Sequence, residues 1–210
     1  DFCDGEPLPL IALSSGPAGA SGNTPVFDRR GASGDVKTLI VTQSERLDAV
    51  FRSQPPGAGS VDAPYPGWDL FWGDAGLQSF FDQVGGTVMS VPADLLTAAD
   101  LEPCDIGIQN EAANAIRDLV IAELLAGDYT HLQILGGKDV IPTFRIPDFV
   151  PFGNEREFTQ DAQLMPGTPD SVALAEGFIS TDQPYVDLQF SSNGDGQVVI
   201  PDISVARLVK

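Results

Sequence analysis

Short apolar runs rich in β-branched residues alternate along the chain with longer stretches of helical periodicity. Each run has five or six residues, too few for a typical helix, and the four runs are Thr38–Thr42, Thr87–Val91, His131–Leu135 and Ile203–Leu208. Continuous runs of this kind predict strands that are buried on both faces of a parallel sheet. Because parallel strands need a crossover connection between them, this alternation constrains the fold more than any other feature.

The stretches between these runs predict amphipathic helices. After Ser44, which can serve as an N-cap, apolar residues recur at helical spacing, and the same spacing returns in Asp74–Val84 before a Gly-Gly pair. The clearest helix is predicted over Glu111–Ala126, capped by Asn110 and ended by Gly127. Its apolar stripe consists of Ile116, Leu119, Val120 and Leu124. We therefore expect right-handed crossovers and an α/β fold, with an open, mainly parallel sheet flanked by helices on both faces.

Three regions fit neither pattern. Residues 1–36 are rich in Gly and Pro and predict a long irregular N-terminal arm ahead of an α/β region at 37–210. Gln54–Gly67 is typical of a surface insertion. Thr143–Phe178 is too long for a plain connection and predicts a functional or partner-facing loop that contains a hairpin. The last predicted strand lies two residues from the end of the printed chain, so we expect the region to be part of a larger α/β protein.

The charge balance narrows the classes of partner. With 30 acidic and 11 basic residues, the formal net charge is −19, whereas a nucleic-acid binder needs a basic face to displace counterions from phosphate. The same charge disfavours docking on an anionic membrane, and no apolar run reaches the roughly 18 residues of a membrane span. We therefore expect no nucleic-acid and no membrane partner. A chain this rich in Asp and poor in Lys suits an extracellular or high-salt setting.

Cys3 and Cys104 are the only cysteines. A disulfide between them would suit an oxidising compartment, and so a secreted or cell-surface protein, whereas two free thiols fit the sequence equally well. The only histidine, His131, could pair with Cys104 as a nucleophilic dyad. That pairing is disfavoured because His131 begins its predicted strand, and ligands of open α/β sheets bind beyond the carboxyl ends of strands. Common hydrolase and metalloenzyme motifs are absent, so we assign no catalytic residue to this chain.

Two glycine-rich turns are candidate ligand sites. Gly136–Asp139 follows the third predicted strand, where backbone N–H groups could bind an anion, although a plain tight turn explains the same residues. Ser192–Gly196 is a polar turn whose oxygens could coordinate calcium, with a simple turn of positive φ as the alternative. The carboxylates near this second turn are Asp182, Asp187 and Asp195.

Tyr129–Pro142, Ser180–Leu188 and Pro201–Leu208 form an ordered set of motifs. In this order, these three stretches resemble the gingipain family of caspase-like cysteine peptidases. Tyr129–Pro142 is similar to the strand and glycine turn of that family, Ser180–Leu188 to its "S-D-x-x-Y-a-D-L" segment, and Pro201–Leu208 to its "P-D/E-l-a-v-G-R-L" strand. In addition, Thr38–Thr42 is similar to the opening strand, and Ala115–Arg117 to the "A-I-r" of the helix before the glycine turn.

The resemblance covers residues 37–210 and implies the first of the two α/β subdomains of a secreted cysteine endopeptidase. In that family the catalytic His and Cys lie in the second subdomain, after the Arg-Leu strand, so this chain alone would be inactive. Its partners would be that catalytic subdomain, either downstream or as a separate processed chain, and a protein or peptide substrate. Ala206 stands where the family usually has Gly, which is a sterically small change.

Some members of the family bind calcium, and the resemblance implies no required cofactor. Gly137 stands where those members have an Asp ligand, whereas Asp202 matches a second acidic ligand position. Together with the polar turn, this leaves Asp195 and Asp202 as candidate calcium ligands. Two other functions fit the same sequence: a non-catalytic, peptidase-like binding or scaffold module that uses Thr143–Phe178, and a small-ligand-binding α/β domain that uses Gly136–Asp139.

Overall fold

The computed structural model describes residues 3, 37–53, 79, 81–149, 157, 167–188 and 201–208. Three of the predicted features lie outside these residues: the insertion at Gln54–Gly67, the polar turn at Ser192–Gly196, and the N-terminal arm apart from Cys3. No described helix combines the length and the apolar composition needed to cross a membrane.

Four parallel strands form the main sheet, in the order β2-β1-β3-β6. Their bounds are Thr38–Thr42 for β1, Gly86–Ser90 for β2, His131–Leu135 for β3 and Ser204–Leu208 for β6. The α/β fold and the four predicted strands are confirmed; β2 begins and ends one residue earlier than predicted, and β6 begins one residue later. The strand order reverses between β1 and β3, and in open α/β sheets ligands tend to bind at the carboxyl ends beside such a reversal.

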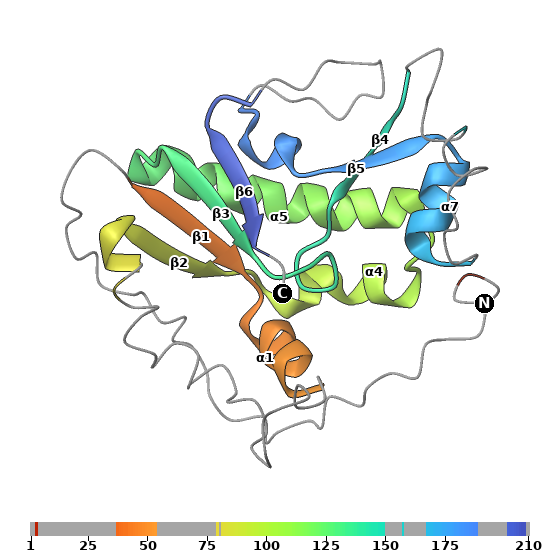
Figure 1. Cartoon of the computed structure of the whole chain (residues 1–210), viewed down its shortest axis with the longest axis horizontal. Coiled ribbons are helices and arrows are strands. Elements are labelled where there is room, and N and C mark those ends of the chain that lie inside the picture. The colour runs from red at the N-terminus through yellow and green to blue at the C-terminus, as the bar shows by residue number, and fades with distance from the viewer. Residues whose placement is uncertain are drawn as a thin grey trace.

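One long helix covers a face of this sheet. In Figure 1, α5 (Ile106–Gly127) runs behind the strands, preceded in the chain by η1 (Ala93–Leu96) and α4 (Thr97–Leu101), while α1 (Ser44–Ser53) lies below the end of β1. The buried face of α5 belongs to the same apolar core as β1 and β3. Its members, which recur at helical spacing, are Ala113, Ile116, Val120 and Leu124.

The start and the stripe of α5 differ from prediction. The helix begins at Ile106 because Asp105, and not Asn110, is its N-cap; the Asp105 carboxylate accepts a backbone N–H bond of 2.9 Å from three residues ahead. Leu119 was assigned to the apolar stripe but is 40% exposed, whereas Ala113 is fully buried. The reason is geometric: Leu119 is the i+3 neighbour of Ile116, but the buried residues advance in steps of four to Val120 and Leu124, which leaves Leu119 at the margin of the stripe.

The predicted loop Thr143–Phe178 brings its two ends together in a small antiparallel sheet. β4 (Phe144–Pro147) pairs with β5 (Phe178–Thr181), and α7 (Pro169–Ala175) lies between them in the chain. This pair is not the hairpin expected inside the loop, because its strands are far apart in sequence and β5 continues beyond Phe178 to Thr181. The short helix η2 (Gln183–Val186) then leads away from β5.

Cys3 and Cys104 form a disulfide, with their Cα atoms 5.7 Å apart. Of the two alternatives that the sequence left open, the structure shows the bonded one. Cys104 therefore has no thiol to offer to His131, which is exposed at the start of β3 with its Nδ1 atom 2.9 Å from the Thr130 hydroxyl.

Candidate functional site

The carboxyl ends of β3 and β6 meet at a glycine turn. Gly136 has a φ of +114°, and a Cβ atom there would lie 2.6 Å from Cβ of Val140, so the position requires glycine. The Gly136 N–H donates to the Leu208 carbonyl at 2.9 Å, which joins the turn to β6. The Gly137 carbonyl accepts bonds of 3.0 Å from the N–H groups of Val140 and Ile141. This bonding confirms the prediction of a tight turn.

The Arg207 side chain of β6 lies at the centre of this turn. Its guanidinium donates two bonds to the Asp182 carboxylate, from Nε to Oδ2 at 2.8 Å and from Nη2 to Oδ1 at 2.6 Å. Its remaining bonds, at 2.8 to 3.5 Å, go to the backbone carbonyls of Gly136, Gly137, Ile141 and Pro142. The two charged side chains are only 12% and 17% exposed. The ion pair is thus shielded from water, which strengthens its charge-assisted hydrogen bonds.

The chemistry of arginine suits this position. A planar guanidinium presents its donors as a rigid fork, so it can grip one carboxylate with two bonds and still reach several carbonyls. Through these contacts Arg207 ties three separate segments together: β6, the glycine turn after β3, and the bend after β5 that carries Asp182. We call this group of contacts the Arg207 cluster.

Tyr185 extends the Arg207 cluster into the core. The residue is 1% exposed, its hydroxyl donates to the Pro142 carbonyl at 2.8 Å, and its ring meets Phe144 edge-on with the centroids 5.0 Å apart. Burial raises the pKa of the Tyr185 phenol well above its usual value; the positive charge of Arg207 lowers it and the negative charge of Asp182 raises it again. The phenol is therefore a neutral hydrogen-bond donor in the folded protein.

Helix α5 is joined to the same region by Arg117. Nε of Arg117 donates to the Pro184 carbonyl and Nη2 to the Asp187 carbonyl, both at 2.7 Å. Since both acceptors flank Tyr185 in the chain, these bonds fix η2 on the helix. The helix, the glycine turn and β6 thus hold the segment 182–187 from three directions.

Asp202, one candidate calcium ligand, is already engaged in a different role. Its Oδ2 accepts the Leu188 N–H at 2.8 Å, and its own N–H donates to the Val186 carbonyl at 2.9 Å. Both carboxylate oxygens of Asp182 bind Arg207. In the described part of the chain no group of three or more acidic, His or Cys residues could hold a metal ion. The described donors therefore do not fit a calcium centre, and Asp195, the other candidate, lies outside the described residues.

Two groups that could bind an anion at Gly136–Asp139 have other partners. The Gly136 N–H donates to the Leu208 carbonyl, and Lys138 forms an ion pair with Asp170. The Asp139 carboxylate also lies over Gly137, where a Cβ atom would be 2.4 Å from its Oδ1. A carboxylate beside the turn repels a phosphate, so the geometry favours the plain turn.

A second polar group joins β4 to its neighbours. Arg145, which is 7% exposed, donates to the Asp170 carboxylate at 2.7 Å, and Lys138 pairs with the same carboxylate. Burial raises the pKa of Asp170, but the hydrogen bonds and charges of Lys138 and Arg145 outweigh this, and the net pKa lies below its ordinary value. Asn110, predicted as a helix cap, instead pairs with the Arg145 backbone through its side-chain amide, by two bonds of 2.8 Å.

Sequence reasoning missed the roles of Arg117, Asn110 and Arg207. A usable signal existed for Arg207, because an arginine inside an otherwise apolar strand run must have a partner if the strand is buried. Nothing local marks Arg117 or Asn110, because their acceptors lie 67 and 35 residues further along the chain.

The described residues also border a hollow of about 280 Å³ on the sheet, lined by residues that include Ile40, His131, Gln133 and Ala206. It lies toward the amino ends of the strands, away from the Arg207 cluster. No family model matches the chain, and neither the curated proteins nor the solved structures show a match.

Proposed function

We propose that this chain is the N-terminal, non-catalytic subdomain of a secreted, gingipain-like cysteine endopeptidase, where it supports the catalytic subdomain. The observation that carries the proposal is the Arg207 cluster. It unites the three stretches that resemble the family, because Arg207 of the last stretch binds Asp182 of the second and the turn of the first. Arg117, from the matching helix, binds the second stretch as well. Chance similarities scattered along a chain have no reason to converge in space.

The role of this subdomain follows from the edge of the sheet. Residues of a strand alternate in the direction of their backbone groups. The Leu208 carbonyl accepts the N–H of Gly136, the residue that follows β3, so the backbone groups of Ser204 and Ala206 also face β3, while those of Val205 and Arg207 face the opposite edge. Among the described strands, β6 has a partner on one side only. An edge of this kind can accept the catalytic subdomain, and the Arg207 cluster holds it in place.

In the complete enzyme, a Cys thiolate would attack the peptide carbonyl and a His would shuttle the proton. In this proposal both groups come from the catalytic subdomain. Secretion is supported by the Cys3–Cys104 disulfide, since such bonds persist in oxidising compartments and are rare in reducing ones.

The test is to produce the chain together with the sequence encoded after Lys210. The extended protein should cleave peptides from a mixed library, and iodoacetamide, which alkylates thiolates, should abolish the cleavage. The matched control is residues 1–210 alone, which should cleave nothing. Extended protein that folds but shows no alkylation-sensitive cleavage would overturn the peptidase proposal and favour the scaffold module.

Arg207→Met in the extended protein tests whether the Arg207 cluster supports the activity of the catalytic subdomain. If the Arg207 cluster positions the edge for the catalytic subdomain, this variant should lose most of its peptidase activity at a temperature where circular dichroism still shows it folded. The control is Asp94→Asn, which changes an exposed carboxylate of η1 that takes no part in the cluster. Equal activity of both variants would contradict the supporting role of Arg207.

A further inference from the structure

The two ends of α5 are both fastened to the beginning of the chain. At its start, Cys104 lies one residue before the N-cap Asp105 and is bonded to Cys3. At its end, Nζ of Lys37 donates to the Gly127 carbonyl at 3.4 Å, and the Lys37 carbonyl accepts the Thr130 N–H at 2.9 Å. A helix of 22 residues is about 33 Å long. The disulfide is thus a covalent attachment far from the point where Lys37 enters the sheet.

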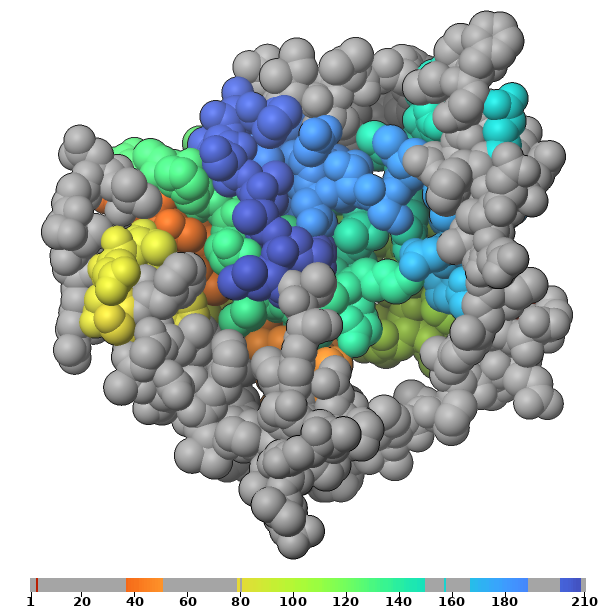
Figure 2. All heavy atoms as spheres, in the orientation of Figure 1, coloured from red at the N-terminus to blue at the C-terminus, as the bar shows by residue number. Residues whose placement is uncertain are grey.

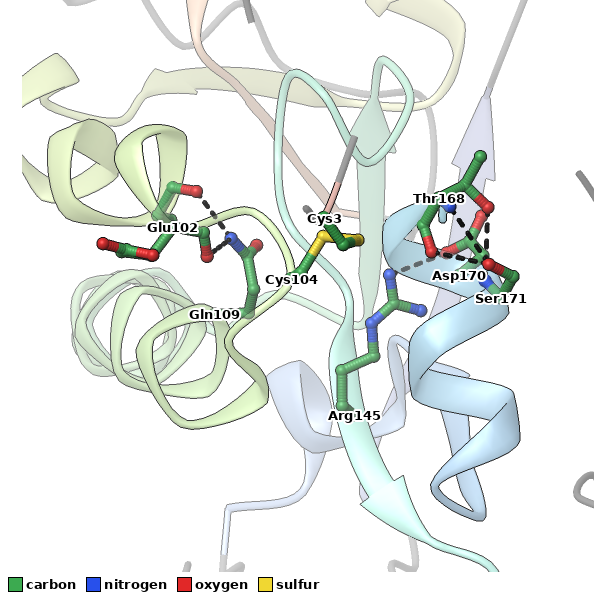
Figure 3. The surroundings of a disulfide bond; sticks show 9 residues. Cys3, Glu102, Cys104, Gln109, Arg145, Thr168, Asp170 and Ser171 are labelled. Carbon is green, nitrogen blue, oxygen red and sulfur yellow. Dashed lines mark hydrogen bonds and ion pairs between the residues drawn. A yellow bond between two sulfur atoms is a disulfide. The ribbon is translucent and has the colours of Figure 1, made fainter. Parts of the chain in front are cut away.

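The corner between α4 and α5 has non-covalent support of its own. Asp105 caps the helix, with its Oδ1 accepting the Ile108 N–H and its carbonyl accepting the Gln109 N–H. The Gln109 side chain turns back and donates to the Ala99 carbonyl at 2.6 Å and to the Glu102 carbonyl at 3.3 Å. Figure 3 shows Gln109 reaching Glu102 close to the Cys3–Cys104 bond. The corner therefore has bonds that survive when the disulfide opens.

The covalent ring closed by the disulfide is long and contains half of the main sheet. Its cysteines are 101 residues apart in sequence, and the ring includes β1 and β2 but neither α5, β3 nor β6. Closing a ring of this length restricts the unfolded chain strongly, and this stabilises the folded state. Both cysteines are partly exposed, so a reductant can reach them.

We propose that the Cys3–Cys104 disulfide is a redox-sensitive clasp, which sets the stability of the domain without being needed for its fold. A dithiol reductant, small or protein-borne, would open it by two successive exchanges. In the first, a reductant thiolate attacks one sulfur, the S–S bond breaks, and the other sulfur leaves as a thiolate that takes up a proton. In the second, the remaining reductant thiolate attacks the reductant sulfur of the mixed disulfide, and the protein sulfur leaves as a thiolate that takes up a proton. The protein gains two electrons and two protons, and the reductant becomes a disulfide. The inference does not depend on the proposed function.

The test compares the oxidised chain, the chain in dithiothreitol, and the double variant Cys3→Ser/Cys104→Ser by thermal unfolding. Reduction should lower Tm by roughly 10 °C, as expected for a ring of about 100 residues in a domain of this size. The double variant should have the Tm of the reduced protein and should not respond to dithiothreitol. An unchanged Tm on reduction would overturn the proposal, as would an intact mass showing two free thiols in the oxidised sample.

Hydrogen exchange separates a clasp from a bond on which the fold depends. After reduction, the amides of Ile108 and Gln109 should stay protected at 10 °C, because their acceptors on Asp105 remain. Exchange in β1, which requires global unfolding, should accelerate by the factor that the lost stability predicts. Loss of protection throughout the chain would show that the disulfide is a prerequisite of folding, and the clasp would be rejected. The double variant serves as the control for any direct effect of dithiothreitol.

Discussion

β1 and β6 are both five-residue parallel strands paired with β3, yet they are held in different ways. Every residue of β1 is buried, whereas β6 alternates between exposed and half-buried residues. In Figure 2, side chains of β6 form a visible dark-blue surface on the near face, while little of β1 can be seen. β1 lies between β2 and β3 and is held by apolar packing. β6 has less apolar packing, and the Arg207 cluster supplies specific polar contacts instead. One sheet therefore combines a strand buried on every side with an edge strand whose pairing and partial packing are reinforced by the contacts of Arg207.

Truncations at the positions of β1 and β6 that pair with Leu132 should show this difference most strongly. Leu39→Ala in β1 removes a side chain that is 0% exposed and should cost about 2–5 kcal/mol of unfolding free energy. Val205→Ala in β6, at a half-buried position, should cost about 1 kcal/mol or less. Urea unfolding of both variants measures the two costs. Equal losses would show that β6 depends on apolar packing as much as β1 does.

Removing the charge from the Arg207 cluster should give the next largest effect. Arg207→Met leaves the Asp182 carboxylate and several carbonyls without their donor, and should cost about 2–4 kcal/mol because the pair is largely buried. Arg207→Lys should recover only part of this, since an ammonium cannot make the two-pronged contact with Asp182.

A double-mutant cycle identifies the source of that loss. Asp182→Asn combined with Arg207→Met should cost clearly less than the sum of the two single variants, because the second change removes a carboxylate that is already unpaired. Additive losses in urea unfolding would mean that the two side chains do not stabilise the fold as a pair.

The same contrast explains how far the sequence could predict this molecule. Strands such as β1 are predictable because a run of apolar β-branched residues is a local pattern. Their parallel direction follows from the helices that connect them. The start of α5 was misplaced because Asp105 and Asn110 are both good caps, and the choice between them depends on β4, which pairs with the Asn110 side chain.

The candidate site was less accessible to sequence reasoning than the fold. Gly136 and Asp182 were singled out for ligand chemistry, whereas the structure uses both to hold Arg207. The calcium hypothesis at Asp202 follows from the family resemblance, whereas in the structure its carboxylate accepts the backbone N–H of Leu188. A polar residue in a turn shows that a partner is needed but does not identify it, because the partner is set by tertiary contacts 14 to 71 residues away.

The Tyr185 hydroxyl should make a smaller contribution to the stability of the Arg207 cluster, and this contribution should depend on pH. Tyr185→Phe removes the bond to the Pro142 carbonyl and should cost about 1 kcal/mol at pH 7. Burial raises the pKa of Tyr185 in the folded state. The protonated phenol therefore contributes its full stabilisation below the unfolded-state pKa of about 10, and this contribution is lost as the pH rises above that pKa. Urea midpoints between pH 8 and pH 11 should thus fall less steeply for Tyr185→Phe than for the unmodified chain. Parallel curves would show that the phenol can ionise within the fold.

The exposed face of β6 should respond least. Ala206 is exposed beside the half-buried Gln133. The Gln133 side-chain amide donates to the Ala206 backbone carbonyl, so this bond does not depend on the side chain at position 206. Ala206→Lys should therefore change the stability of residues 1–210 by less than about 0.5 kcal/mol, the usual range for a surface change. Ala206→Ser is the control that changes the side chain without adding a charge.

In the extended protein, the Lys variant should impair peptidase activity if the catalytic subdomain covers this face, and the Ser variant should not. A loss of several kcal/mol already in residues 1–210 would mean that β6 is packed on both faces within this chain, and the contrast with β1 would fail.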